Sequence, residues 1–222
     1  MTPDDSSRWL RRACRDIGVM PVLTIEYAKH SVPLARALAD GGLHVIEVTL
    51  RTDAALDSIR EMSAMSGILI GAGTLLTPAC AEKAKKAGAA FGVSPGSTDG
   101  LIQACLDLDL PLLPGAATAS EIMALSDQGF DFVKFFPAET NGGLAALSAL
   151  ASPLPHVSYC PTGGITAASA NRYLEHQNII CVGGSWIAPA DTIIAEDWDR
   201  IRATAQRTRS DRPPAPSDNC SP

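Results

Sequence analysis

Short apolar segments recur along the chain and alternate with segments of helical periodicity. Eight stretches read as strands: residues 21–25, 45–50, 68–72, 90–94, 111–114, 132–136, 157–160 and 179–182. Their starts lie roughly 20 to 25 residues apart, about the length of one strand, one helix and two loops. The stretches are almost continuously apolar, as is typical of parallel strands that are covered on both faces.

The segments between these strands favour helices. Residues 31–40 place apolar side chains at helical spacing, and the glycine pair at 41–42 ends the run. Thr77 is a capping residue followed by Pro78 at the first helical position, so the pattern predicts that a helix begins there. The same plan recurs at residues 98–108 and 119–127.

Eight strands that alternate with helices predict an α/β fold, a (β/α)8 TIM barrel. A doubly wound open sheet has the same local pattern and remains an alternative. The segment around residues 9–17 has the spacing of an amphipathic helix, and we expect this extra N-terminal helix to close the barrel floor. We expect residues 1–207 to form one domain and residues 208–222, which lack apolar anchors, to be a disordered C-terminal tail.

Composition narrows the classes of function. The chain has 222 residues, enough for one sizeable core, and 18 Lys plus Arg against 24 Asp plus Glu leave a formal charge of −6. An acidic balance argues against nucleic acid as a partner, because duplex binding depends on neutralising phosphates. No stretch approaches the roughly 18 to 20 continuous apolar residues of a membrane span, and the charged start lacks a secretory signal. We therefore expect a cytoplasmic protein without a membrane partner.

The spacing of cysteine and histidine predicts neither disulfides nor a metal site. The six cysteines are scattered, and no pair has C-x-x-C spacing. Cys160 and Cys181 lie in apolar runs and should be small buried side chains. None of the four histidines has the spacing of a metal ligand, so we expect no metal.

A lysine interrupts the most aromatic of the strands. Because side chains alternate along a strand, Lys134 shares a face with Phe132 and Phe136. Burial disfavours the charged ammonium form and so favours a free amine that can attack a carbonyl. The alternative is a lysine whose stem packs while its head reaches solvent or pairs with a carboxylate. The position alone leaves both interpretations open.

Glu47 and Arg51 lie on one face near the end of the second strand. A carboxylate beside an amine could transfer protons, and an arginine could bind a substrate carboxylate through two parallel hydrogen bonds. A buried structural Glu–Arg pair is the alternative. The third strand ends at residues 71–74, where Thr74 supplies a hydroxyl and the glycines allow close approach of the backbone.

The last two strands end in glycine pairs. Gly163 and Gly164 follow the seventh strand, while Gly183 and Gly184, with Ser185 after them, follow the eighth. Glycines leave backbone N–H groups uncovered, and a helix that begins after them favours an anion. The loops after strands seven and eight are the common phosphate site of TIM barrels, so we predict phosphate binding there. Two ordinary tight turns are the alternative.

Several motifs, taken together and in order, resemble the bacterial 2-keto-3-deoxy-6-phosphogluconate (KDPG) and 4-hydroxy-2-oxoglutarate (KHG) aldolases. They lie at residues 47–52, 71–74, 94–96, 134–139, 141–143, 160–165 and 183–186, within a resemblance that extends from about residue 21 to residue 202. The resemblance implies a class I aldolase that forms a Schiff base, needs no metal or other cofactor, acts on a small 2-keto acid and assembles as a homotrimer.

The same resemblance implies a role for each matching residue. It makes Lys134 the Schiff-base lysine and Glu47 the proton shuttle, with Arg51 and Thr74 holding the carboxylate of the keto acid. The residues that line the pocket would be Pro95, Phe136 and Thr162. The residues that receive the phosphate would be Gly163, Gly164, Gly184 and Ser185.

The implied reaction cleaves 2-dehydro-3-deoxy-6-phosphogluconate to pyruvate and glyceraldehyde 3-phosphate, in the Entner–Doudoroff branch of carbohydrate metabolism. A second implied reaction cleaves 4-hydroxy-2-oxoglutarate to pyruvate and glyoxylate. One alternative is a phosphosugar isomerase or epimerase barrel, which would keep the glycine loops but need no lysine at position 134. Another is a non-catalytic barrel that binds a phosphorylated metabolite.

Overall fold

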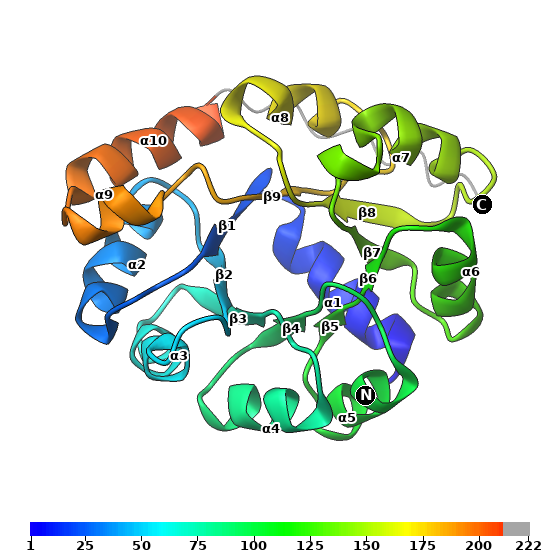
Figure 1. Cartoon of the computed structure of the whole chain (residues 1–222), viewed down its shortest axis with the longest axis horizontal. Coiled ribbons are helices and arrows are strands. Elements are labelled where there is room, and N and C mark those ends of the chain that lie inside the picture. The colour runs from blue at the N-terminus through cyan, green and yellow to red at the C-terminus, as the bar shows by residue number, and fades with distance from the viewer. Residues whose placement is uncertain (211–222) are drawn as a thin grey trace.

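Parallel strands occupy the centre of the molecule, and helices surround them (Figure 1). The computed structural model describes residues 1–210. The strands are β1 (Val19–Leu23), β2 (Val45–Thr49), β3 (Leu69–Gly73), β4 (Phe91–Val93), β5 (Leu112–Leu113), β6 (Gly115–Ala116), β7 (Phe132–Phe135), β8 (Ser158–Pro161) and β9 (Val182–Gly184). The helices are α1 (Pro3–Cys14), α2 (Ser31–Asp40), α3 (Ala55–Ser63), α4 (Pro78–Lys86), α5 (Asp99–Asp107), α6 (Ala119–Asp127), α7 (Gly143–Ala151), α8 (Ala167–Leu174), α9 (Ala190–Ile194) and α10 (Trp198–Ser210), with short 3-10 turns η1 (Ala28–His30) and η2 (Glu139–Asn141).

The strands pair in parallel within two sheets. One sheet has the order β5-β4-β3-β2-β1-β9, and the other has the order β6-β7-β8. The expected α/β fold with parallel strands is confirmed, but the hydrogen-bonded ladder does not run as one closed barrel of eight strands. Pro114 divides the strand expected at residues 111–114 into β5 and β6, because proline has no N–H to donate to the ladder.

The two sheets nevertheless adjoin at both ends. At one end, the chain passes from β5 to β6 through Pro114, whose carbonyl oxygen accepts a hydrogen bond from the Lys134 amide at 2.8 Å. At the other, isolated parallel bridges pair Tyr159 with Ile179 and Thr162 with Gly183. The last strand itself begins at Val182, later than the sequence pattern predicts.

Threonine caps set the start of several helices. The side-chain oxygens of Thr77, Thr98, Thr118 and Thr166 each accept a hydrogen bond from the backbone N–H three residues later. Such caps satisfy N–H groups that have no partner within the helix. The helix starts predicted at Thr77 and at residue 98 are therefore confirmed, because the local chemistry that predicts them is present.

Helix α10 extends past the predicted domain boundary. It continues to Ser210, Thr208 Oγ1 donates to the Thr204 carbonyl at 2.9 Å, and Arg209 reaches the carbonyl of Gly42 at 3.3 Å. The prediction of a disordered tail is wrong for residues 208–210, because the hydrogen bonds of the last turn and contacts with α2 hold them in the helix. Residues 211–222 lie outside the described part of the chain.

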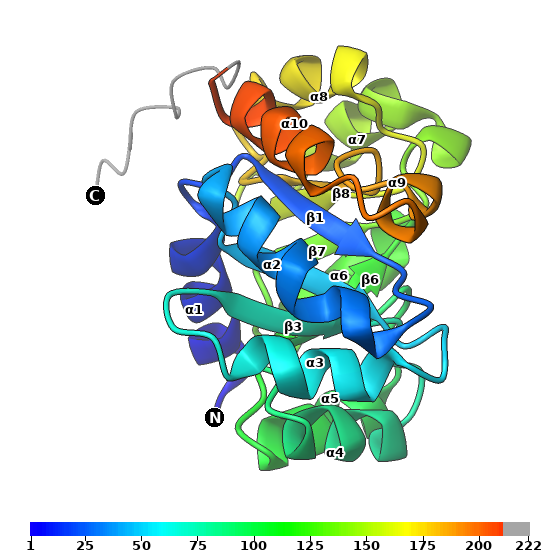
Figure 2. The same ribbon diagram turned by 90° about the vertical axis from the view of Figure 1, so that its left-hand side faces the viewer.

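Helix α1 lies across the end of the molecule where the strands begin (Figure 2). Ser6 Oγ on α1 donates to the Leu112 carbonyl at 3.1 Å and accepts from the Leu112 amide at 2.8 Å, which joins the helix to β5. Beneath α1 the inward side chains form an apolar layer, here called the floor. It consists of Leu10, Cys14, Ile17, Met20, Val45, Phe91, Val93, Leu113, Phe132, Cys160 and Cys181.

The floor contains the cysteines that the sequence places in apolar runs. Cys160 and Cys181 are fully buried as free thiols, with their sulfur atoms 3.5 Å apart. Hydrogen bonds of the Cys181 thiol with Cys14 and Cys160, the latter donated by Cys181, together with burial, raise the pKa of Cys181 well above its ordinary value. These side chains therefore pack as small uncharged groups, as predicted.

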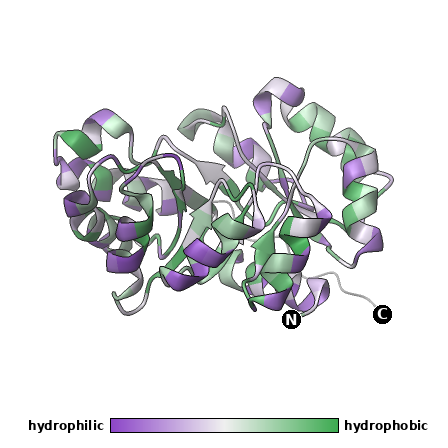
Figure 3. Ribbon diagram, turned by 60° about the horizontal axis from the view of Figure 1, so that its bottom comes forward, coloured by the Kyte–Doolittle hydropathy of each residue, from purple (hydrophilic) through white to green (hydrophobic). Residues whose placement is uncertain are grey.

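Hydrophilic residues lie mainly on the outward sides of the helices, and hydrophobic residues concentrate on the strands (Figure 3). This distribution is expected where helices cover a parallel sheet. Among residues 1–210, no helix combines the length and the apolarity that crossing a membrane requires.

Candidate active site

A cavity of about 430 Å³ opens at the end of the molecule opposite α1, among the loops that follow the strands. Nine of the eleven predicted site residues line it, and Glu47 and Gly184 lie just outside the lining. The lining residues are Val22, Thr24, Arg51, Thr74, Pro95, Lys134, Phe136, Thr162, Gly163, Gly164, Ile165, Gly183 and Ser185. Because the carboxyl ends of the parallel strands meet at one end of the molecule, side chains that lie far apart in the sequence come together here.

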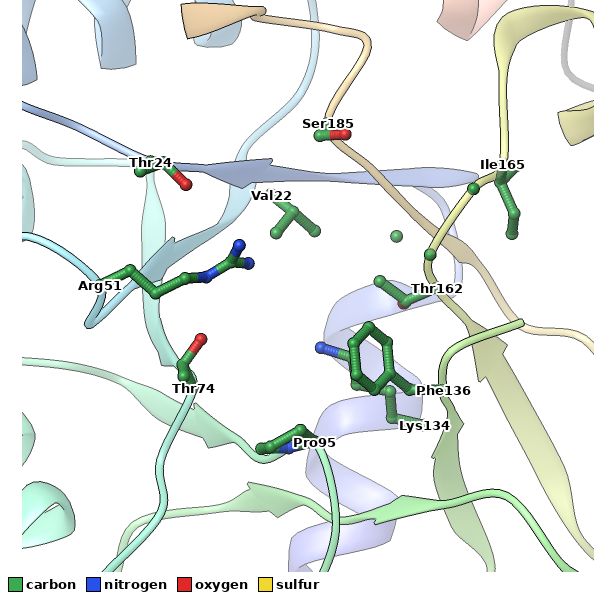
Figure 4. A pocket seen from close by; sticks show the side chains of 13 residues that line it. Val22, Thr24, Arg51, Thr74, Pro95, Lys134, Phe136, Thr162, Ile165 and Ser185 are labelled. Atoms are coloured by element: carbon green, nitrogen blue, oxygen red, sulfur yellow. The ribbon is translucent and has the colours of Figure 1, made fainter. Parts of the chain in front are cut away.

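Lys134 and Glu47 meet inside this end of the molecule. The Lys134 Nζ atom lies 3.4 Å from Glu47 Oε1, and the two residues are only 5% and 1% exposed. The nitrogen also lies 5.1 Å from the centroid of the Phe136 ring and faces the cavity (Figure 4). Glu47 Oε2 is buried, and it has no hydrogen-bond partner among residues 1–210. A buried amine beside a carboxylate with a free acceptor atom is suited to covalent and proton-transfer chemistry.

The backbone of β3 makes room for the Glu47 carboxylate. Gly73 pairs with Thr49 in the parallel ladder, and a Cβ atom at Gly73 would lie 2.1 Å from Glu47 Oε1. Only a glycine fits at this position without moving the carboxylate. The close approach predicted from residues 71–74 is therefore observed, and its function is to accommodate Glu47.

Arg51 and Thr74 lie on one side of the cavity, while Lys134, Phe136 and Thr162 lie on the other (Figure 4). Glu47 pairs with Lys134, not with Arg51, so the structural Glu–Arg pair does not form. No ion pair of Arg51 occurs within residues 1–210, which leaves its guanidinium available to an anion. Thr74 has a positive φ of 61°, an uncommon conformation for a residue with a Cβ atom, and such strain concentrates at functional sites.

The glycine loop, defined here as residues 162–165, forms another wall of the cavity. Gly163 and Gly164 have φ values of 102° and 80°, which side chains rarely adopt. Ser185 lies beyond β9, beside this loop in the lining. Gly184 does not line the cavity: a Cβ atom there would lie 2.3 Å from the Trp186 ring, so this glycine makes space for tryptophan.

Four lining residues are not among the predicted site residues: Val22, Thr24, Ile165 and Gly183. Thr24 follows β1 directly and is a polar residue at a strand end, so the rule that selects Thr74 could have found it. Its Oγ1 atom lies 3.1 Å from Thr49 Oγ1, which donates to the Leu23 carbonyl at 2.9 Å. Val22 and Ile165 are apolar, and nothing in the sequence distinguishes them from core residues.

Comparison with known proteins agrees with this geometry. A family model described as KDPG and KHG aldolase matches residues 10–204. The KHG/KDPG aldolase of Escherichia coli (strain K12) is 46% identical over 189 residues, which is 85% of this chain and 89% of that protein.

Solved structures give the same result. The KDPG aldolase of Zymomonas mobilis ZM4 with 3-phosphoglycerate matches with a TM-score of 0.89 at 44% identity, over 95% of this chain and all of that chain. The KDPG aldolase of Legionella pneumophila, with pyruvate captured at low pH as a covalent carbinolamine, has a TM-score of 0.86 at 39% identity, over 89% and 97% of the two chains. Since the family model spans most of the chain and these relatives are covered almost completely, the chain belongs to the KDPG and KHG aldolase family.

Proposed function

We propose that this protein is a class I aldolase that cleaves 2-dehydro-3-deoxy-6-phosphogluconate to pyruvate and glyceraldehyde 3-phosphate. It would also cleave 4-hydroxy-2-oxoglutarate to pyruvate and glyoxylate. The observation that carries the proposal is the buried Lys134 amine, which faces the cavity 3.4 Å from the Glu47 carboxylate. The names of the relatives favour this reaction over an isomerase, an epimerase or a non-catalytic phosphometabolite-binding barrel.

The reaction begins at the Lys134 nitrogen. As a free amine it attacks the C2 ketone of the substrate and forms a carbinolamine, and loss of water from this adduct leaves a protonated imine. The carbinolamine captured in the Legionella pneumophila enzyme is the corresponding intermediate in that protein. The imine requires no metal, because its cationic nitrogen withdraws electrons from the neighbouring carbon. Activity that survives treatment with a chelator would test this point.

Glu47 moves the protons that the bond cleavage requires. Its carboxylate takes the proton of the C4 hydroxyl, so that the C3–C4 bond breaks into an aldehyde and an enamine on Lys134. The same carboxylate then assists protonation of the enamine at C3. Hydrolysis of the resulting imine releases pyruvate and regenerates the amine.

The other lining residues orient the substrate. Arg51 and Thr74 would hold the carboxylate of the keto acid, which places C2 opposite the Lys134 nitrogen in an attacking geometry. Pro95, Phe136 and Thr162 would enclose the reacting carbons. A Cβ atom at Gly183 would lie 2.2 Å from Thr162 Oγ1, so this glycine allows Thr162 its position at the wall.

The phosphate would bind at the opposite end of the cavity. Gly163 and Gly164 would offer backbone N–H groups, and Ser185 would offer its hydroxyl, with Gly184 supporting the turn. Binding energy from a group far from the breaking bond can assist orientation at that bond.

We also propose that the two sheets act as one (β/α)8 barrel closed by α1. The isolated bridges between β8 and the β9 region, the continuity through Pro114 and the shared floor support this closure. The homotrimer and the cytoplasmic location implied by the resemblance remain predictions. Sedimentation velocity tests the first, and cell fractionation tests the second.

Reductive trapping tests the proposed function. Incubation with pyruvate and borohydride should add one reduced pyruvate to the intact mass, and peptide mapping should place it on Lys134. An isomerase, an epimerase or a binding barrel would form no imine and give no adduct. Absence of the adduct in the wild-type protein would therefore refute the proposal.

A further inference from the structure

A segment outside the cavity sets the direction of the glycine-loop backbone. The Ala138 amide donates to the Thr162 carbonyl at 2.8 Å, and the Glu139 amide donates to the Gly163 carbonyl at 3.0 Å. In a trans peptide the C=O and N–H bonds point in opposite directions. Since the two carbonyls point toward residues 138–139, the N–H groups of Gly163 and Gly164 point away from that segment. Neither N–H group donates a hydrogen bond within residues 1–210.

The Glu139 side chain is held in turn by a tyrosine from α8. Tyr173, which is 2% exposed, donates its hydroxyl to Glu139 Oε1 at 2.7 Å. Burial, and then the Glu139 carboxylate, raise the pKa of Tyr173 above its ordinary value, so the hydroxyl keeps its proton. A hydrogen bond to a charged acceptor is stronger than one between neutral groups.

The glycine loop is shaped around this pair. A Cβ atom at Gly164 would lie 2.7 Å from Glu139 Cβ, so the stem of Glu139 packs directly against the loop backbone. A Cβ atom at Gly143, the first residue of α7, would lie 3.3 Å from both Glu139 Oε2 and the Tyr173 hydroxyl. Glu139 and Tyr173 therefore connect η2, α7 and α8 behind the loop, and neither residue lines the cavity.

We infer that Glu139 and Tyr173 are positioning residues for the phosphate end of the substrate. The pair would hold residues 138–139 against the loop and so keep the Gly163 and Gly164 N–H groups aimed at a phosphate. The inference rests on the proposed function, because it assumes that this loop receives phosphate. It predicts that the pair affects the phosphorylated substrate and has little effect on chemistry at Lys134.

The test compares two substrates in the variant Tyr173→Phe, which removes one hydroxyl. KM for the phosphorylated substrate should rise about tenfold, the size expected for a lost charge-assisted hydrogen bond, with little change in kcat. Cleavage of 4-hydroxy-2-oxoglutarate and imine formation with pyruvate should change by less than about twofold, because neither involves the phosphate.

Two further variants separate positioning from simple structural support. Glu139→Ala should reproduce the effect of Tyr173→Phe, while Glu139→Gln should restore most of the affinity, because its amide oxygen still accepts the tyrosine hydrogen bond. Tyr159→Phe is the matched control. Tyr159 is fully buried, its hydroxyl has no hydrogen-bond partner in the described part of the chain, and it does not line the cavity. This control should leave both substrates unchanged.

Equal losses on both substrates, or an unchanged KM for the phosphorylated substrate, would overturn the inference. Calorimetric titration of the wild-type protein and the variants with inorganic phosphate checks the loop without any aldol chemistry. If phosphate binding weakens in Tyr173→Phe, the inference stands even where pyruvate trapping fails. If trapping succeeds and phosphate binding does not change, the inference fails while the proposed function stands.

Discussion

The inward side chains change character within two residues along the same strand. In β2, Val45 belongs to the floor and Glu47 contacts Lys134. In β7, Phe132 belongs to the floor and Lys134 faces the cavity. The pattern recurs at the end of β8, where Cys160 belongs to the floor and Thr162, directly after the strand, lines the cavity. A step of two residues keeps a side chain on the same face, so the floor and the site are successive layers of one interior.

Burial contributes differently to the stability of the fold in the two layers. Floor side chains are apolar, and close packing of such groups stabilises the fold. The site layer buries an amine, a carboxylate and an acceptor atom without a partner, and a buried ion pair is weak evidence for stability. The comparison indicates that the floor contributes stability, whereas the groups of the site layer fit the proposed chemistry better than a purely structural role.

The largest effect is expected from Lys134→Met, which replaces the amine of the site layer with an apolar side chain of the kind found in the floor. We expect kcat to fall by at least about 10⁴-fold, because the proposed nucleophile is lost. The melting temperature should fall while the fold is kept, because the buried Glu47 carboxylate loses its lysine partner. Assays of pyruvate release and a thermal melt measure the two effects. Turnover near the wild-type level would contradict the nucleophilic role.

Glu47→Gln keeps the shape of the side chain and removes the carboxylate that we propose transfers protons. We expect kcat to fall by about 10² to 10⁴-fold, the usual contribution of a general acid–base group. Exchange of the pyruvate methyl protons in deuterated water, followed by NMR, reports enamine protonation directly and should slow in parallel. Exchange at the wild-type rate would assign proton transfer to another group.

Ser185→Asp tests the proposed phosphate-binding end of the cavity. A carboxylate there should repel a phosphate, lowering kcat/KM for the phosphorylated substrate by about 10²-fold. Cleavage of 4-hydroxy-2-oxoglutarate, which has no phosphate, should change far less. Ser185→Ala serves as the control, since it removes the hydroxyl without adding charge. Equal loss on both substrates would remove the phosphate assignment.

The smallest effect is expected from the floor itself. Phe132 lies two residues before Lys134 in the same strand. The substitution Phe132→Leu should lower the free energy of unfolding by about 1 kcal/mol. For a chain of this size that corresponds to a melting temperature lower by about 2–4 °C. KM and kcat should remain unchanged. A changed KM with an unchanged melting temperature would show that this floor residue affects the site and not the stability, which contradicts the comparison.

Much of the site can be predicted from the sequence, because strand ends that carry polar residues are local features. Lys134, Arg51 and Thr74 interrupt or end apolar runs, and side-chain alternation assigns their faces. Thr24 satisfies the same rule and could have been included. The contact between Tyr173 and Glu139 leaves no such trace, because Tyr173 has the appearance of an ordinary core residue of a helix.

Two other predictions fail because the apolar or polar character of a segment does not by itself decide its structure. The apolar run at residues 111–114 predicts a continuous strand, yet Pro114 lacks the donor that a ladder requires, and two short strands result. The polar composition after residue 207 predicts disorder, yet Arg209 hydrogen-bonds with the Gly42 carbonyl and the helix continues. The first outcome follows from the chemistry of one residue inside an apolar run, and the second depends on a partner that is distant in the sequence.

The sequence by itself determined the alternation of strands and helices, the helix caps and the polar residues at strand ends, because these follow from the chemistry of neighbouring residues. Only the tertiary structure decided that Lys134 lies beside Glu47, that Glu47 pairs with this lysine instead of Arg51, and that Gly73 leaves space for its carboxylate. The physical reason is that proximity between strands depends on register and curvature, which the packing of the whole chain sets.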